Sequence, residues 1–189
     1  MKEIPMIESK ADLKRYIAED MSFYHQYAKR DRLILWCIQD PAYLIVRYLR
    51  FLRKEEYYAN TRKDILGKLL YFYYFRRKNQ LGNKLGFKIP KNCFGPGLMI
   101  YHHGTIIVNE AARIGSNCRL HGNNCIGNKG NVDLAPIIGD NLDLGFGACV
   151  IGGVTLGDNL TVGANAVVVR SFPEGNATLT GVPARELKV

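Results

Sequence analysis

The chain has 189 residues, of which 47% are hydrophobic, so it is long enough to bury a core without disulfide or metal support. No apolar run approaches the roughly 20 residues that span a bilayer, and we expect no signal peptide. The five cysteines are odd in number and show no metal-ligand spacing, which predicts reduced thiols in a cytoplasmic protein.

Charge divides the chain into two parts. Residues 1–90 hold 19 Lys and Arg against 10 Asp and Glu, whereas residues 91–189 hold 7 against 7. Ten of the eleven tyrosines also lie in the first part. We therefore expect an α-helical region over residues 1–86 and a separate domain over residues 87–189.

Three capping signals predict three helices in the first part. Each signal joins a cap residue with a side-chain oxygen to an acidic residue or a proline in the first turn. A short apolar segment, residues 32–39, separates the first two helices. The expected helices run from Ser9 to about Arg30, from Asp40 to about Tyr58 and from Thr61 to about Lys78.

Basic residues recur among the tyrosines of these helices and invite a nucleic-acid or membrane interpretation. No recognised nucleic-acid motif accompanies them, so we expect no nucleic-acid partner. A solvated face that packs on the second domain or on a neighbouring subunit is the simpler interpretation, and weak association with an anionic membrane surface or glycan is an intermediate one. The residues are Arg47, Arg50, Arg53, Lys54, Arg76, Arg77 and Lys78.

The second part repeats with a period of six. Glycine often follows the aliphatic residue, and a small or apolar residue often lies two positions before it. This period fits three-sided coils with one hexad per face, in which the aliphatic residue points inward and Gly, Asn or Asp turns the corner. The aliphatic row is Ile114, Leu120, Ile126, Val132, Ile138, Leu144, Val150, Leu156, Val162 and Val168, and the second row is Ala112, Cys118, Leu142, Ala148, Val154, Leu160 and Ala166.

Two local features of this pattern stand out. The segment 128–136 is either a coil or a loop extruded between coils, in which case Val132 is in phase by coincidence. His102 occupies a phase of the row where an aliphatic residue is expected, and such a break indicates a functional site or an irregular first coil. Cys118 is expected to be a small core residue, not a nucleophile.

His121 follows Leu120 at a position where glycine is usual, one 18-residue turn plus one residue after His102. It could orient His102, contact a substrate, act as the base itself or simply face solvent. His103 and Asn123 are further candidates near the same place.

The segment Gly95–Gly130, the glycine-rich coils and the ending Gly181–Arg185 (GVPAR) resemble the hexapeptide-repeat acyltransferases, most closely the serine acetyltransferase-like branch. The resemblance covers residues 89–189. It implies a mainly β fold, a left-handed parallel β-helix preceded by helices. It also implies an acetyl-CoA-dependent O-acetyltransferase that forms homotrimers with active sites between subunits.

The resemblance also assigns roles to residues. His102 corresponds to the catalytic histidine, which removes a proton from an acceptor hydroxyl as it attacks a thioester, and Glu110 to an acidic residue of the site. Backbone N–H groups could stabilise the oxyanion, and no metal is required. Contacts with acetyl-CoA would come from Gly145, Ala148, Gly163, Ala164, Pro183 and Arg185.

Departures from the branch concern the acceptor. Tyr101 stands where serine acetyltransferases carry an Asp, Leu134 and Ala135 replace an Arg-His pair that grips the serine carboxylate, and Phe87 replaces the Asp partner of the catalytic histidine. Without that clamp, we expect a sugar or glycan acceptor, as in polysaccharide-pathway O-acetyltransferases, with Tyr101, His103 and Asn123 contacting it. The alternatives are L-serine as acceptor, or a non-catalytic trimeric scaffold.

Overall fold

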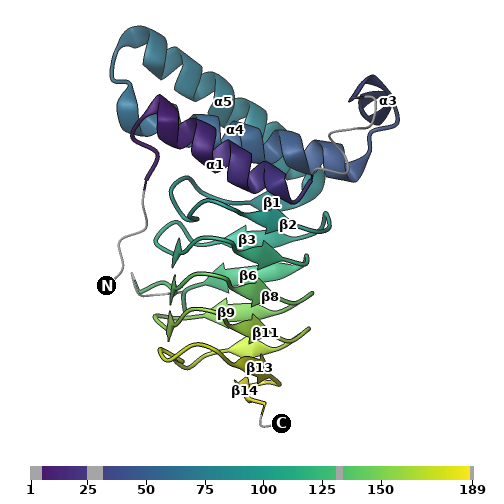
Figure 1. Cartoon of the computed structure of the whole chain (residues 1–189), viewed down its shortest axis with the longest axis vertical. Coiled ribbons are helices and arrows are strands. Elements are labelled where there is room, and N and C mark those ends of the chain that lie inside the picture. Colours follow the sequence, from purple (N-terminus) through teal and green to yellow (C-terminus); the bar gives the residue numbers. More distant parts are fainter. Residues whose placement is uncertain (1–5, 25–31, 131–133, 188–189) are drawn as a thin grey trace.

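The structure, a computed structural model, describes residues 6–24, 32–130 and 134–187. Helices cover one end of a left-handed parallel β-helix, as the sequence predicts (Figure 1). The helices are α1 (Lys10–Ser22), α3 (Arg32–Cys37), α4 (Pro41–Thr61) and α5 (Ile65–Leu85). The strands are β1 (Phe87–Lys88), β2 (Met99–Ile100), β3 (Ile106–Val108), β4 (Arg113–Ile114), β5 (Arg119–Leu120), β6 (Asn124–Gly127), β7 (Ile137–Ile138), β8 (Asp143–Leu144), β9 (Cys149–Ile151), β10 (Thr155–Leu156), β11 (Thr161–Val162), β12 (Val167–Val168), β13 (Thr178–Thr180) and β14 (Arg185–Glu186).

Two of the three predicted caps are confirmed. The Ser9 hydroxyl accepts a hydrogen bond from the Asp12 amide at 3.1 Å, and the Asp40 carboxylate accepts one from the Ala42 amide at 2.9 Å. The predicted cap at Thr61 is wrong, because Thr61 is the last residue of α4 and its hydroxyl donates to the Tyr57 carbonyl at 2.7 Å. A side-chain bond back into its own helix leaves this hydroxyl no role as a cap for the next one.

The helix ends also differ from the prediction. Asp64 is the N-cap of α5, which continues past Lys78 to Leu85 and ends at Gly86, a residue with φ of +84°. A left-handed glycine is a common helix stop, and it lies further along than apolar periodicity alone indicates. α1 ends at Ser22, short of the predicted Arg30, and residues 25–31 lie outside the described part of the chain.

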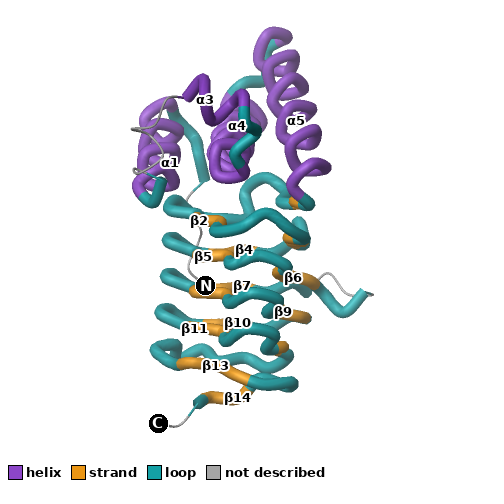
Figure 2. Tube along the Cα trace, turned by 90° about the vertical axis from the view of Figure 1, so that its right-hand side faces the viewer, coloured by secondary structure: helices purple, strands orange, loops and turns teal. Residues whose placement is uncertain are grey.

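Three parallel sheets form the faces of the β-helix (Figure 2). Their strand orders are β1-β3-β6-β9-β12, β10-β7-β4 and β14-β13-β11-β8-β5-β2, and only β14 runs antiparallel to its neighbour β13. The aliphatic row and the second row of the hexad pattern point inward. Every described member of both rows is at most 6% exposed, which confirms the hexad assignment and the core position of Cys118.

The pairing register of the strands shows whether the segment 128–136 belongs to a coil or is inserted between coils. Leu144 pairs with Val162, an offset of 18 residues, whereas Ile114 pairs with Ile138, an offset of 24. The longer coil therefore holds six additional residues, and the register places them between β6 and β7. Because the insertion is one hexad long, Val132 keeps the phase of the row without belonging to a coil, and its own position lies outside the described residues.

A buried ionic network joins the helices to the first coil. The fully buried Arg53 guanidinium contacts the Asp20 carboxylate at 2.8 Å, the Glu56 carboxylate at 3.0 Å and the carbonyls of Phe94 and Gly95 at 3.0 and 2.7 Å. Asp20 also accepts from the Gly97 amide at 2.9 Å. These bonds satisfy backbone groups at the end of the β-helix, where no further coil pairs with them.

This burial corrects the predicted basic face. Arg53 belongs to the network, and the buried Lys78 lies 2.7 Å from the Glu55 carboxylate and donates to the Ile89 carbonyl. Both side chains hold the fold together and present no charge to a partner. Within the described ranges, no helix is long and apolar enough to cross a membrane.

Candidate active site

The corner between β2 and β3 is wider than the corresponding corner of the next coil, between β5 and β6. Ile100 pairs with Leu120 and Val108 pairs with Ile126, so eight residues separate the two inward positions where the next coil has six. The two additional residues shift His102 out of the aliphatic row. His102 is exposed at the corner, so the prediction that it breaks the core row is wrong, whereas the irregular first coil is confirmed.

The same shift places Tyr101 above His121. The Tyr101 amide donates to the Leu120 carbonyl at 2.9 Å, and the rings of Tyr101 and His121 stack with centroids 4.3 Å apart and planes 22° apart. His102 is next to this pair, with its ring centroid 6.4 Å from that of Tyr101. The structure thus brings the two predicted histidines to one corner on successive coils.

His121 has a carboxylate partner. Its Nε2 lies 2.8 Å from the Oδ1 of Asp143, and the other carboxylate oxygen lies 3.8 Å from the Arg119 guanidinium. About a third of each side chain is exposed, 33% for His121 and 31% for Asp143. An imidazole whose Nε2 donates to a carboxylate keeps Nδ1 as an acceptor, which is the orientation a base requires.

Asp143 is not apparent as a site residue from the sequence pattern. It lies 22 residues from His121 and is adjacent only because β5 pairs with β8 at an offset of 24. A uniform 18-residue repeat places other residues beside His121, so the signal becomes visible only after the six-residue loop is recognised.

Gly122 is favoured at the centre of this corner by its backbone conformation, because a Cβ atom there would make only ordinary van der Waals contacts. A Cβ atom there would lie 3.6 Å from the His102 Cβ and 3.4 Å from the Phe146 ring, and its φ of +112° is unfavourable for other residues. Phe146, which the sequence did not single out, is 47% exposed and adds an apolar surface beside the histidines.

Asn123 and His103 have different surroundings. The Asn123 side-chain oxygen accepts from the Thr105 amide at 3.0 Å and so holds the widened corner, which gives it a structural role. The neighbouring Asn124 is buried, and its amide donates to the Gly145 carbonyl at 2.8 Å. His103 is exposed beside His102.

Glu110 is not brought to His102 within one chain. It follows β3, so the whole of that strand separates the two side chains, and Glu110 is exposed at the next corner. Its carbonyl accepts from the Arg113 guanidinium at 2.9 Å.

The residues predicted to contact acetyl-CoA divide into two groups. Gly145, Gly163 and Ala164 continue the corner of His121 toward the C-terminal end, with Ala164 exposed. Ala148 instead is fully buried, and its carbonyl accepts from the Asn124 amide group at 3.2 Å, so its contact with acetyl-CoA stays a prediction. Its position belongs to the inward row, whose side chains cannot reach the surface. Pro183 and Arg185 are exposed beside the last coil.

Close coil packing already explains one of these glycines. A Cβ atom at Gly145 would lie 2.8 Å from both the Ala164 nitrogen and the Val162 carbonyl oxygen. The Gly145 amide also donates to that carbonyl at 2.8 Å. Its small size is therefore required by the fold, whatever it contacts outside.

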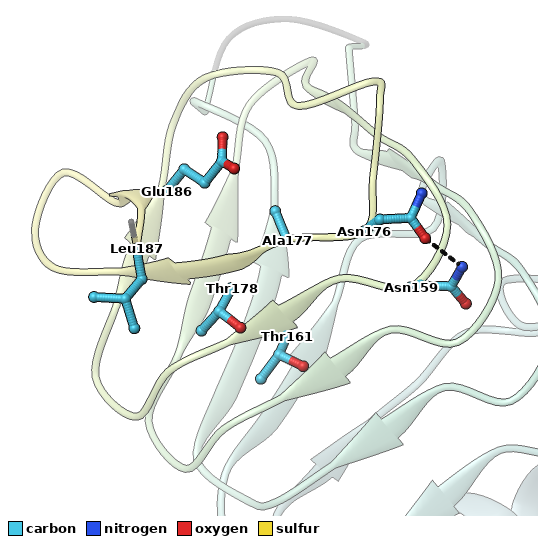
Figure 3. A pocket seen from close by; sticks show the side chains of 7 residues that line it. All are labelled: Asn159, Thr161, Asn176, Ala177, Thr178, Glu186 and Leu187. Carbon is cyan, nitrogen blue, oxygen red and sulfur yellow. Dashed lines mark hydrogen bonds between the residues drawn. The ribbon is translucent and has the colours of Figure 1, made fainter. Parts of the chain in front are cut away.

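A polar hollow of about 480 Å³ lies at the far end of the β-helix from the histidines. Figure 3 shows its seven lining side chains around β11, β13 and β14, with the Asn159 amide donating to the Asn176 oxygen at 2.8 Å. Glu186 gives it a negative charge, which disfavours phosphate groups. The lining residues are Asn159, Thr161, Asn176, Ala177, Thr178, Glu186 and Leu187.

Residues 6–24, 32–130 and 134–187 contain no group of three or more His, Cys, Asp or Glu side chains arranged to hold a metal ion.

Comparison with known proteins identifies relatives. No family model matches the chain. It is 35% identical over 100 residues to serine acetyltransferase 3 (mitochondrial) of Arabidopsis thaliana. The aligned segment covers 52% of this chain and 25% of that protein. It is 41% identical over 98 residues to the chloroplastic serine acetyltransferase 1 of the same plant, 51% of this chain and 31% of that protein. The chain therefore spans about a quarter to a third of the length of these relatives.

Solved structures of serine acetyltransferases are similar to this chain over nearly its whole length. The serine acetyltransferase of Neisseria gonorrhoeae superimposes with a TM-score of 0.67 and 25% identity, covering 95% of this chain and 68% of that one. Soybean serine acetyltransferase gives a TM-score of 0.69 over 94% of this chain and 70% of that one, and at 22% identity it supports the fold alone. The chain is thus similar to serine acetyltransferases, and these likenesses support its resemblance to the serine acetyltransferase-like branch of the hexapeptide-repeat acyltransferases.

Proposed function

We propose that the protein is an acetyl-CoA-dependent O-acetyltransferase whose reaction takes place at the corner of His102 and His121. The observation that carries this proposal is the convergence of two histidines on successive coils, one of them held by Asp143 at 2.8 Å, in a chain related to serine acetyltransferases. A scaffold without activity has no need of an imidazole and carboxylate paired at a half-exposed corner.

In this proposal His102 is the general base. Its side chain is exposed and forms no hydrogen bond with the described residues, so a ring nitrogen is available to an acceptor hydroxyl. The bound thioester supplies the acetyl group. His102 takes the hydroxyl proton as the oxygen attacks the thioester carbonyl, and it gives that proton to the sulfur as CoA leaves, while His121, oriented by Asp143, accepts a hydrogen bond from the acceptor at Nδ1.

The surface along this corner suits a long thin cosubstrate. Small residues at Gly163 and Ala164 leave the backbone approachable toward the C-terminal coils, and the exposed Arg185 offers a guanidinium for a phosphate group. We propose that acetyl-CoA extends along this track from the histidines.

The acceptor has two candidates. L-Serine is favoured by the comparisons, because the named relatives are serine acetyltransferases and the Neisseria gonorrhoeae protein has been solved in complex with serine. A sugar hydroxyl, which the sequence favours, is supported by the Tyr101 ring, which stacks on His121 and is still 39% exposed, since an aromatic surface beside the histidines suits a sugar ring better than a carboxylate. Leu134 and Ala135 likewise carry no charge that could pair with a carboxylate.

The proposal includes a homotrimer with sites between subunits. Glu110 lies beyond β3 from His102 in its own chain, so it can act on a His102 only across a subunit boundary. An assembly of parallel β-helices would provide such a boundary, and the mass of the assembly in solution tests it directly.

The decisive experiment measures release of free CoA from acetyl-CoA with L-serine and with a panel of sugars. We expect activity that falls by about a hundredfold or more in His102→Ala. Release with serine would assign the acceptor that the comparisons favour, and release with a sugar alone would assign the other. If acetyl-CoA binds and the full panel gives no turnover above the acceptor-free rate, the enzyme proposal is contradicted for these acceptors, and if acetyl-CoA does not bind it fails altogether.

A further inference from the structure

The first half of α5 exposes a stripe of large apolar side chains. Their spacings of three, four and seven residues place them on one side of the helix, away from α4. An uninterrupted apolar surface of this kind on a helix usually marks a contact with another molecule or with lipid. The α5 stripe consists of Ile65, Leu66, Leu69, Phe72 and Tyr73, with exposed fractions of 81%, 57%, 64%, 67% and 52%.

The charges around the α5 stripe are almost all positive. α5 contains no acidic residue, and the two acidic residues of α4, Glu55 and Glu56, are buried against Lys78 and Arg53. Asp64, which precedes α5, is paired with Arg62 at 2.8 Å. The accessible basic residues of the helix pair are Arg47, Arg50, Lys54, Lys68, Arg76, Arg77 and Lys84.

Basic side chains also continue the stripe itself. Arg76 follows Phe72 by four residues and Leu69 by seven, so it lies on the same side of α5, and Lys68 lies at the border of that side. Long basic side chains beside an apolar face can reach lipid headgroups while the apolar groups enter the boundary of the acyl chains.

We propose that the α5 stripe docks the protein on the surface of an anionic lipid bilayer. Apolar residues flanked by exposed cations such as Lys68 and Arg76 fit such a surface, which offers both hydrocarbon and negative charge. A second copy of the same face would bring its own cations against these, at a cost in repulsion. Nucleic acid would neutralise the cations and leave the apolar side chains without a partner.

The test is co-sedimentation of the full chain with vesicles of phosphatidylcholine, with and without phosphatidylglycerol. We expect binding to the anionic vesicles that weakens with salt. Leu69→Ser with Phe72→Ser should lower the partition at least tenfold through lost apolar contact. Lys68→Gln with Arg76→Gln should lower it about thirtyfold.

The matched control variants remove exposed side chains of the same kinds from other parts of the protein. Ile107→Ser with Leu134→Ser takes away exposed apolar groups from the coils, and Lys129→Gln with Arg170→Gln takes away exposed cations, and neither pair should change the partition. Circular dichroism and thermal unfolding show that each variant is folded.

Three results would overturn the proposal. One is no binding to anionic vesicles, or equal binding to neutral ones. Another is a change of oligomeric mass in Leu69→Ser with Phe72→Ser, which would assign the stripe to contact between copies. The third is tighter, stripe-independent binding to duplex DNA than to vesicles.

Discussion

The Tyr24 hydroxyl lies 2.8 Å from the carbonyl oxygen of Ile100 and 3.0 Å from its amide nitrogen, and so takes the place of a neighbouring strand. β2 is the last strand of its sheet, with β5 on one side only. A single side chain thus supplies the two bonds that another coil would have made, two residues before His102.

Tyr24→Phe removes both bonds and leaves two buried backbone groups of Ile100 unpaired. We expect a loss of about 1–3 kcal/mol in the free energy of unfolding, measured by urea denaturation. We also expect a lower kcat, because the chain leading into the His102 corner loses its anchor. Tyr43→Phe, in the partly buried surface of α4, is the matched control and should change both quantities little.

Asp143→Asn tests whether the carboxylate positions His121. We expect kcat to fall about tenfold or more, since the imidazole loses its anionic partner. A double-mutant cycle with His121→Ala checks the coupling: the double variant should be no slower than His121→Ala alone. Arg119→Gln removes only the 3.8 Å contact and should have a smaller effect. Additive losses would show that the two side chains act independently.

Much of the coil architecture could be predicted because each hexad repeats the same inward residue. The stacking of Tyr101 on His121 could not, since it depends on two additional residues in one corner, which make β2 pair with β5 at an offset of 20 whereas β3 pairs with β6 at an offset of 18. Asp143 was hidden for a similar reason, by a loop of one hexad that leaves the phase unchanged. The burial of Arg53 was also beyond reach, because a basic residue among tyrosines gives the same local pattern whether it faces solvent or a carboxylate.

Arg53→Met should destabilise the junction between helices and coils strongly. The substitution leaves the buried carboxylates of Asp20 and Glu56 without their cation, at a cost of about 3–5 kcal/mol. Arg47→Met is the control, because Arg47 lies over the rings of Tyr43 and Phe51 at the surface and should cost under about 1 kcal/mol. Equal losses in the two variants would contradict the structural role of the network.

Thiol reactivity should follow burial. Burial raises the pKa of the Cys93 thiol to about 12, and it also raises that of Cys118. At pH 8 a group with such a pKa is thiolate in only about one molecule in ten thousand, and the thiolate is the reactive form. A disulfide reagent should therefore modify the exposed Cys37 in the native protein and reach Cys93 and Cys118 only after denaturation. Rapid modification of Cys118 in the folded state would contradict its place in the core.

Deletion of residues 128–133 should convert the long coil into an ordinary one. The remaining residues Leu134–Pro136 would then follow Gly127 as Gly152–Val154 follow Ile151, and the inward row would stay in phase. We expect a thermal unfolding midpoint within a few degrees of the parent. Deletion of residues 128–130 alone, half a hexad, breaks the phase and should lower the midpoint more.

Both ends of the coil stack are closed, one by the helices with Tyr24 and the other by β14, which runs antiparallel to β13. A stack of parallel strands with bare ends is a template on which further chains can add, in the manner of a growing fibre. The cap at each end sets the length of the stack at one molecule. Variants that remove the cap at either end should therefore polymerise end to end on storage. This polymerisation should precede any loss of secondary structure.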